Sequence, residues 1–160
     1  HWCLLSEIKH GYPLFSNQFW VKDKEGTEYL VAFHLQDRSK FLESIRPQCK
    51  DGYTLCLMDA EKHLFFDGQI GVRVQDERVV KILPCSLEKL FDMKRKAASK
   101  PQGHCTVCGA AAALGCSKCK SVYCNQKCQL LDWNRDHKKD CVVLKEIFNF
   151  GEFVWDWFKD

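Results

Sequence analysis

The segment CSKCKSVYCNQKC, residues 116–128, decides what the C-terminal third of the chain is, because it places four cysteines within thirteen residues. Extended in both directions, it gives the pattern C-x2-C-x7-C-x2-C-x4-C-x3-C-x8-H-x3-C over residues 105–141. Zinc prefers soft or borderline ligands such as cysteine sulfur and histidine nitrogen, and a C-x2-C pair is a recurrent half of a zinc site. Eight ligands predict two closed sites that hold two structural Zn²⁺ ions and leave no position for a catalytic water. The predicted ligands are Cys105, Cys108, Cys116, Cys119, Cys124, Cys128, His137 and Cys141.

Disulfides and a catalytic thiol are the two other possible uses of these cysteines. Disulfides would leave one of the seven unpaired and would ignore His137, and a catalytic thiol would need a base other than that histidine. The segment has few large apolar residues, so a metal must supply much of its folding energy. Four further cysteines are scattered and are interpreted as small buried hydrophobes. The dense clustering of cysteines, together with first residues that do not resemble a signal peptide, favours an intracellular, reducing compartment, either nuclear or cytoplasmic.

The pattern, together with the flanking YC (123–124), CQ (128–129), DW (132–133) and HKKDC (137–141), resembles the MYND-type zinc finger. Spacing alone leaves sequential and interleaved pairing of the ligands open. The resemblance implies interleaving, with Cys105, Cys108, Cys124 and Cys128 around one zinc. Cys116, Cys119, His137 and Cys141 would then hold the other.

The resemblance also implies a protein partner. Several MYND fingers bind short peptides rich in proline and leucine, and the matching positions here are Ser117, Gln129 and Trp133. Gln129 and Trp133 are spaced i and i+4, so they share one face of a helix. A flat indole can cover a proline ring, and a Gln amide can pair with an extended backbone. The alternative is that Trp133 fills the small core between the zinc sites.

The first 92 residues alternate between strand-like runs and turns. FWVKD (19–23) and EYLVAFHL (28–35) predict one hairpin, and HLFFDGQIGVRV (63–74) predicts a second that turns at Asp67-Gly68. WCLLSEIK (2–9), GYTLCLMD (52–59) and ERVVKIL (77–83) supply the other strands. A helix is expected over 37–45, with apolar residues at 41, 42 and 45. This order resembles an OB-fold, and the predicted class is α+β with a small N-terminal β-barrel.

The predicted domains are the barrel (1–92), a basic linker (93–103), the finger (104–142) and an aromatic helix or tail (143–160). Ser86 is the expected N-cap of a helix that leads into the linker. Nine large apolar residues crowd the tail, which predicts docking on this chain or formation of a homo- or hetero-oligomer. Acidic residues in the tail argue against a membrane surface, and no apolar run reaches the ~20 residues of a membrane span. Because the chain begins with His, it is expected to be a piece of a longer protein.

Single-stranded nucleic acid is the alternative partner. OB-folds bind it by stacking bases on aromatic residues, for which Trp20 is the candidate, and the only basic run includes Lys94, Arg95 and Lys96. The formal charge of +3 is cancelled when seven thiolates bind two Zn²⁺, whereas nucleic-acid binders usually carry a clear basic excess. The favoured function is a non-catalytic adaptor whose finger recruits one protein and whose barrel binds a second. A regulatory fragment of a larger enzyme is a further alternative.

Overall fold

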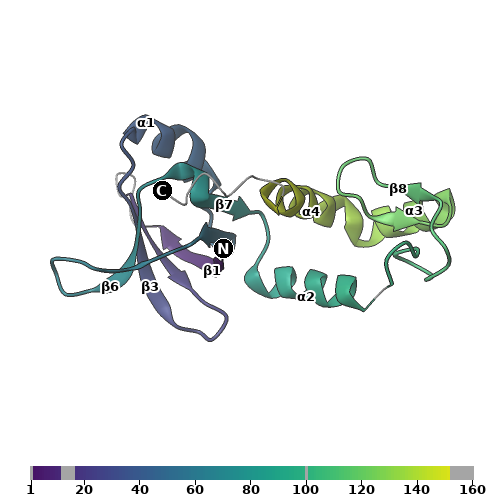
Figure 1. The fold of residues 1–160 in the computed structure, drawn as a ribbon, viewed down its shortest axis with the longest axis horizontal. Helices are drawn as coiled ribbons and strands as arrows, with labels where there is room; N and C mark the ends of the chain where they lie inside the picture. Colours follow the sequence, from purple (N-terminus) through teal and green to yellow (C-terminus); the bar gives the residue numbers. More distant parts are fainter. Residues whose placement is uncertain (1, 12–16, 100, 152–160) are drawn as a thin grey trace. The chain divides into compact units, whose positions relative to one another are not determined.

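A computed structural model describes residues 2–11, 17–99 and 101–151, and it divides into two compact units, His1–Leu90 and Phe91–Asp160. The chain combines an N-terminal sheet with a C-terminal zinc-finger region that ends in a helix, so the predicted α+β class is confirmed (Figure 1).

The first unit is built on a seven-stranded sheet with the order β5-β6-β3-β2-β1-β4-β7. Neighbouring strands are antiparallel except for β3 and β6, which are parallel. The strands are β1 (Cys3–Gly11), β2 (Gln18–Lys22), β3 (Glu28–Phe33), β4 (Thr54–Met58), β5 (Lys62–Leu64), β6 (Ile70–Val74) and β7 (Val80–Leu83).

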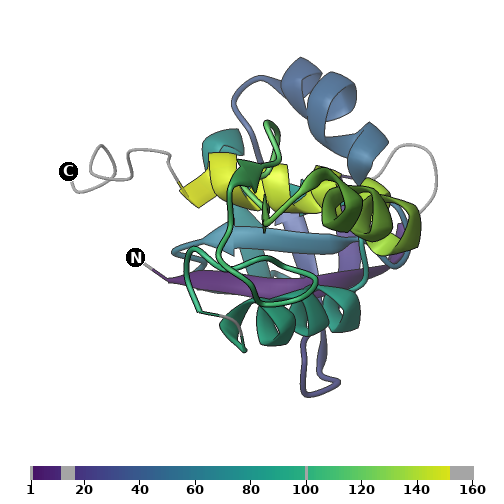
Figure 2. The ribbon, with the colours of Figure 1, turned by 90° about the vertical axis from the view of Figure 1, so that its right-hand side faces the viewer.

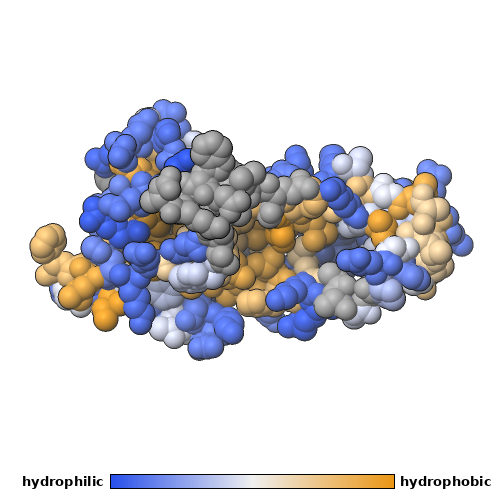
Figure 3. All heavy atoms as spheres, viewed as in Figure 1, coloured by the Kyte–Doolittle hydropathy of each residue, from blue (hydrophilic) through white to orange (hydrophobic). Residues whose placement is uncertain are grey.

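Both predicted hairpins are present. In the turn between β2 and β3, Asp23 Oδ1 accepts the N–H groups of Glu25 and Thr27, each at 2.9 Å, and Gly26 adopts a φ of 92°. A side chain that bonds its own turn and a glycine with positive φ are what a tight connection requires. Apolar residues exposed at the tip of the second hairpin, Leu64, Phe66 and Ile70, form the apolar patch at the left of Figure 3.

Closure of the sheet into a barrel is not confirmed. Among the described strands, β5 and β7 are the two edges, and no pairing joins them. Closure would require β5, which has three residues, to pair with β7, which has four. The strand order is therefore that of an open sheet, and the OB-like likeness stays a prediction.

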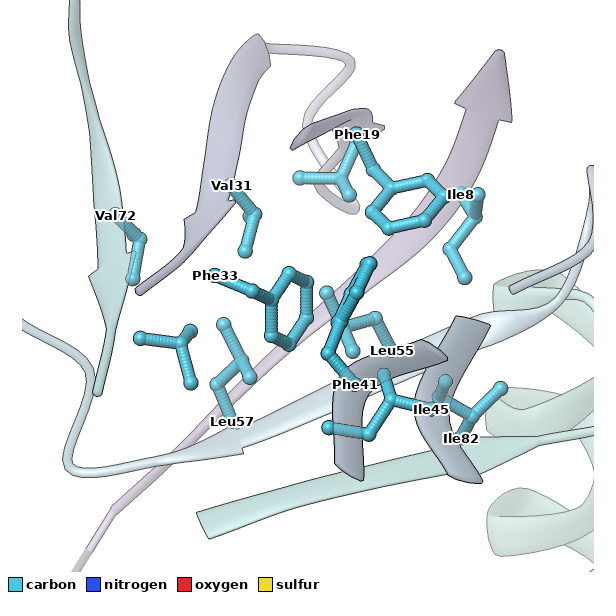
Figure 4. Close-up of a cluster of buried hydrophobic side chains, with 12 residues drawn as sticks. Ile8, Phe19, Val31, Phe33, Phe41, Ile45, Leu55, Leu57, Val72 and Ile82 are labelled. Carbon is cyan, nitrogen blue, oxygen red and sulfur yellow. The ribbon is translucent and has the colours of Figure 1, made fainter. Parts of the chain in front are cut away.

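The core lies between the sheet and the helical segment that follows β3, which comprises α1 (Arg38–Lys40), η1 (Phe41–Ile45) and η2 (Arg46–Gln48) (Figures 1 and 2). Phe41 and Ile45 of this segment are 2% and 6% exposed, as the predicted helix required. Phe33 is the centre of an aromatic group, with ring centroids 6.0 Å from Phe19 and 5.1 Å from Phe41 (Figure 4). Strand and helix thus share one aromatic core.

Helix α2 (Leu87–Ala98) begins with the predicted cap, since Ser86 Oγ accepts the N–H of Lys89 at 3.2 Å. Glu7 of β1 also accepts the Leu87 N–H at 3.3 Å, through Oε2. Its other oxygen accepts Lys9 Nζ at 2.9 Å. The hydrogen bond from Lys9 and then that from Leu87 hold the pKa of Glu7 below its usual 4.5, although burial opposes them.

This lowered pKa predicts a pH dependence. A carboxylate with a depressed folded-state pKa stabilises the fold fully above 4.5 and loses that contribution as the pH falls through the lowered value. We expect Glu7→Gln to destabilise the sheet near neutral pH and the difference from wild type to shrink below pH 4.5. Urea unfolding at several pH values, followed by amide signals of β1 and β4, measures this difference in the free energy of unfolding. Glu43→Gln controls for loss of one exposed charge, and a difference constant with pH would contradict the assignment.

The second unit contains the remainder of α2, a two-stranded sheet and three consecutive helical elements. These are β8 (Leu114–Gly115), β9 (Val122–Tyr123), α3 (Gln126–Asp132), η4 (Trp133–His137) and α4 (Lys138–Gly151). Residues 93–98 of the expected linker are helical, and α4 contains both Cys141 and the first part of the expected tail. Within the described ranges, no helix is long and apolar enough to cross a bilayer.

Candidate metal centre and peptide groove

The eight predicted ligands form two separate groups in the second unit. One contains Cys105, Cys108, Cys124 and Cys128, and the other contains Cys116, Cys119, His137 and Cys141. Within each group the sulfur and nitrogen atoms all lie within 4.8 Å of one another. The pairing that the structure brings together is therefore interleaved.

The distances fit tetrahedral zinc. With Zn–S bonds of about 2.3 Å, two sulfurs on one ion should be roughly 3.8 Å apart. The Sγ atoms of Cys108 and Cys124 are 3.5 Å apart, and those of Cys124 and Cys128 are 3.6 Å apart. In the other group, Cys116 and Cys141 are 3.7 Å apart. These sets fit two structural Zn²⁺ ions, and because four protein ligands close each site, the finger has no catalytic zinc.

The two C-x2-C segments form the same turn. Gly109 follows the first pair and donates its N–H to the Cys105 carbonyl at 3.0 Å, while Lys120 follows the second and donates to the Cys116 carbonyl at 3.2 Å. Both residues adopt positive φ, 75° for Gly109 and 60° for Lys120. This left-handed residue after the second cysteine reverses the chain and turns both sulfurs of a pair toward one point.

Helices supply the remaining ligands. Asn125 caps α3, and its side chain accepts the N–H of Cys128 at 3.0 Å. His137 and Cys141 are spaced i and i+4 at the junction of η4 and α4, so they lie on one helix face. The capped start of α3 positions Cys128, and the i, i+4 spacing positions His137 and Cys141. These helical ligands thus lie opposite the two C-x2-C turns, although they are distant from them in sequence.

The electrostatics of the thiols are consistent with a bound cation. Burial raises the pKa of Cys105, but backbone N–H groups, those of Cys108 and Cys124 foremost, outweigh it and lower the value to about 6. A hydrogen bond to Cys108 and burial raise the pKa of Cys124 to about 12. In the second site, burial and then Cys116 raise the pKa of Cys141 to about 12. Once one thiol ionises, its charge opposes ionisation of its neighbours, so a divalent ion at the centre of each group would stabilise the set of thiolates.

Two residues that orient His137 were not assigned a role from the sequence. Asp132 is buried, accepts the Tyr123 hydroxyl at 2.9 Å and lies 3.6 Å from His137 Nδ1. The other ring nitrogen, Nε2, is 3.5 Å from Cys119 Sγ. A carboxylate beside the non-ligating nitrogen fixes the tautomer and direction of a metal-bound histidine. An aspartate five residues before the ligand, within one helical run, is the signal that could have found it.

The three residues expected to contact a peptide line one groove. Ser117, Gln129 and Trp133 border a hollow of about 360 Å³, together with Lys118 and Leu130. Trp133 is 37% exposed, and its ring centroid lies 5.9 Å from that of His137. The indole therefore rests on a ligand ring and also faces solvent, rather than being enclosed in the core.

The residues proposed for nucleic acid do not form one site within either unit. Trp20 is half-buried on β2, whereas Lys94, Arg95 and Lys96 are exposed on α2 in the other unit. Arg95 and Lys96 both pair with Asp92, at 2.7 and 3.5 Å.

Part of the aromatic tail contacts the finger. Val143 of α4 is buried, and Lys120 Nζ lies 3.5 Å from the centroid of the Phe148 ring. Val142 and Ile147 remain exposed on the same helix. Leu144 and Phe150 are half-buried on this helix, whereas Phe153, Trp155, Trp157 and Phe158 lie outside the described residues.

The chain is similar to several known proteins. Ubiquitin C-terminal hydrolase 15 of Oryza sativa subsp. japonica is 40% identical over 58 residues, which are 35% of this chain and 6% of the relative. Programmed cell death protein 2 of Mus musculus is 47% identical over 44 residues, 27% of this chain and 13% of the relative. Dauer abnormal formation protein 25 of Caenorhabditis elegans is 50% identical over 145 residues, 73% of this chain and 37% of the relative. This chain thus spans a minor part of each.

The family match falls on the metal-binding segment. Residues 105–141 match the zf-MYND family, described as the MYND finger, and the match begins and ends at the first and last predicted ligands. MYND domains mediate protein–protein interactions and are not catalytic. Sequence pattern, interleaved ligand groups and family match agree, and residues 105–141 of this chain are a MYND zinc finger.

Proposed function

We propose that this chain is a non-catalytic adaptor whose finger recruits a partner protein through a short motif rich in proline and leucine. The groove that Ser117, Gln129 and Trp133 line together carries the proposal. Its apolar parts are the indole and Leu130, and its polar parts include an amide and a hydroxyl. An extended peptide needs both, a flat surface for proline or leucine and a polar side chain for its backbone.

The first unit is proposed to bind a second protein. Its sheet exposes Leu64, Phe66 and Ile70 beside the edge strand β5, which supports a role in association. Similarity to the Caenorhabditis elegans relative covers 73% of this chain, more than the finger alone, so it extends into this unit. The exposed Val142 and Ile147 of α4 support an oligomer or a further partner there.

Peptide binding is tested with a fluorescently labelled peptide rich in proline and leucine, titrated into the zinc-loaded chain. We expect saturable binding and a loss of at least about tenfold in affinity for Trp133→Ala, because central aromatic anchors often contribute 2 kcal/mol or more. Leu131→Ala is the matched control, since Leu131 is exposed on α3 but does not line the groove. Equal loss in both variants, or no binding by wild type, would contradict the proposal.

Two proposals concern the setting of the protein. None of the eleven cysteines, each within the described residues, forms a disulfide, which supports a reducing compartment, nuclear or cytoplasmic. The names of several relatives are those of ubiquitin hydrolases, which supports the alternative that this chain is a regulatory part of a larger enzyme. Zinc-loaded peptide binding would be expected in either case.

A further inference from the structure

A hollow of about 360 Å³ lies in the sheet unit, where β3 and β6 end and the segment leading to α1 begins. Its polar lining residues are Asn17, His34, Arg38 and Arg73. Phe33, Leu35 and Phe41 form the apolar part of the wall. Two arginines, an amide and an imidazole therefore face one space, and no lining residue is acidic.

The two arginines are not neutralised by the carboxylates nearby in sequence. Asp37 accepts the N–H and Oγ of Ser39 at 2.9 and 2.6 Å. Asp76 is bound by Arg78 at 2.7 Å, and Glu77 is paired with Lys40. Within the described part of the chain, neither Arg38 nor Arg73 has an ion-pair partner.

A second observation points to a positive potential in this hollow. Burial, and then the charge of Arg73, lower the pKa of His34. Isolated arginines on a surface are usually solvated, but here two come from different elements and converge on a concave wall with aromatic edges. His34, Arg38 and Arg73 are themselves exposed, and the buried rings of Phe33 and Phe41 behind them lower the local dielectric on the inner side, which strengthens the interaction of an anion with the arginines.

We propose that this hollow binds the phosphate monoester group of a ligand. Guanidinium groups present planar pairs of N–H donors that match phosphate oxygens, and each can bind in bidentate fashion. A phosphate monoester carries about −1.5 to −2 charges and three terminal oxygens, which two arginines and an added donor balance better than they balance a carboxylate. The volume exceeds that of a phosphate, so the apolar wall can contact the group that carries it. This site is independent of the peptide groove.

The test uses the zinc-loaded chain with ¹⁵N labelling, at constant ionic strength. The probes are inorganic phosphate, phenyl phosphate, and a short peptide with one phosphoserine beside its unphosphorylated form. We expect saturable shifts at the amides of Asn17, His34 and Arg73, and none with the unphosphorylated peptide. Arg73→Gln should weaken binding by about tenfold or more, because it removes a charge-assisted, bidentate donor to the phosphate.

Arg46→Gln is the matched control, because it removes the same charge from an arginine of the same unit that does not line the hollow. Binding retained in Arg46→Gln and weakened in Arg73→Gln and Arg38→Gln would support the site. Tighter binding of the phosphopeptide than of phenyl phosphate would identify a phosphorylated protein as the source, and the reverse would identify a small phosphate ester. Equal weakening by Arg46→Gln, or no saturation with any probe, would overturn the proposal. Neither result would alter binding at Trp133.

Discussion

Replacing Cys124 and Cys128 together by serine is expected to unfold the MYND finger and to reduce bound zinc from two ions per chain to at most one. Both residues belong to the same site, and structural zinc binding contributes about 10–16 kcal/mol in small fingers. Cys124 directly follows β9 and Cys128 lies in the first turn of α3, so these elements lose the ion that joins them to the first turn. The sheet unit has its own core and should keep its strands.

Zinc content by elemental analysis and an amide spectrum measure the two effects separately. Cys3→Ser with Cys49→Ser is the matched control, because it also removes two thiols but neither belongs to a metal group. We expect that variant to keep two zinc ions and all finger signals. Two zinc ions retained after replacement of Cys124 and Cys128 would refute the ligand assignment.

A reciprocal pair of variants distinguishes interleaved from sequential sites. Cys108→Ser with Cys124→Ser damages one site if the sites interleave but both if they are sequential. Cys108→Ser with Cys116→Ser does the reverse. We expect the first variant to retain one tightly bound zinc ion. In the second variant both sites should lose affinity, so that no zinc ion is tightly bound. The opposite order would show that the pairing in the structure is wrong.

The finger was predictable because its information is local and chemical. Ligand type and spacing predicted two sites of four ligands each, whereas the interleaved pairing was implied only by the resemblance to MYND fingers. The Asp132–His137 contact was not predicted, because an aspartate in a helix has many ordinary explanations. Only the structure shows that Asp132 is buried, accepts the Tyr123 hydroxyl and lies 3.6 Å from His137 Nδ1.

In the sheet, hairpins were predictable and long-range pairing was not. Gly26 and Gly68 both adopt positive φ, and each turn is determined by residues adjacent in sequence. The parallel pairing of β3 with β6 joins Leu30 to Gly71, and nothing local in either strand specifies that partner. The pairing does require glycine at position 71, because a Cβ there would lie 2.2 Å from the Leu30 carbonyl oxygen.

The basic run after Met93 was interpreted as the end of a helix and a linker, yet α2 continues to Ala98. Lysine, arginine and alanine are strong helix formers, so the composition that looked like a linker also favours a helix. Asp92 pairs with Arg95 and Lys96 at spacings i+3 and i+4, which adds support within the same helix. The positive charge of this segment therefore does not distinguish a helix from a linker.

Phe33→Ala is expected to destabilise the sheet unit by about 3–5 kcal/mol, the range for removing a buried phenyl ring and leaving a cavity. Phe33 is 2% exposed and contacts rings from two other elements, Phe19 of β2 and Phe41 of η1 (Figure 4). The cavity would therefore open at the point where the helical segment packs on the sheet. A loss of this size is a large share of the roughly 5–15 kcal/mol that stabilises a typical domain.

Urea unfolding followed by amide signals of β3 and β4 measures the effect, and Phe66→Ala is the matched control. Phe66 is fully exposed at the tip of the second hairpin, so the same truncation there removes no core contact. We expect Phe66→Ala to leave the midpoint nearly unchanged and Phe33→Ala to lower it strongly. Because the metal ligands all belong to the other unit, both variants should bind two zinc ions. If Phe33→Ala instead abolished zinc binding, the sheet would be a requirement for folding of the finger, and the two units would unfold as one.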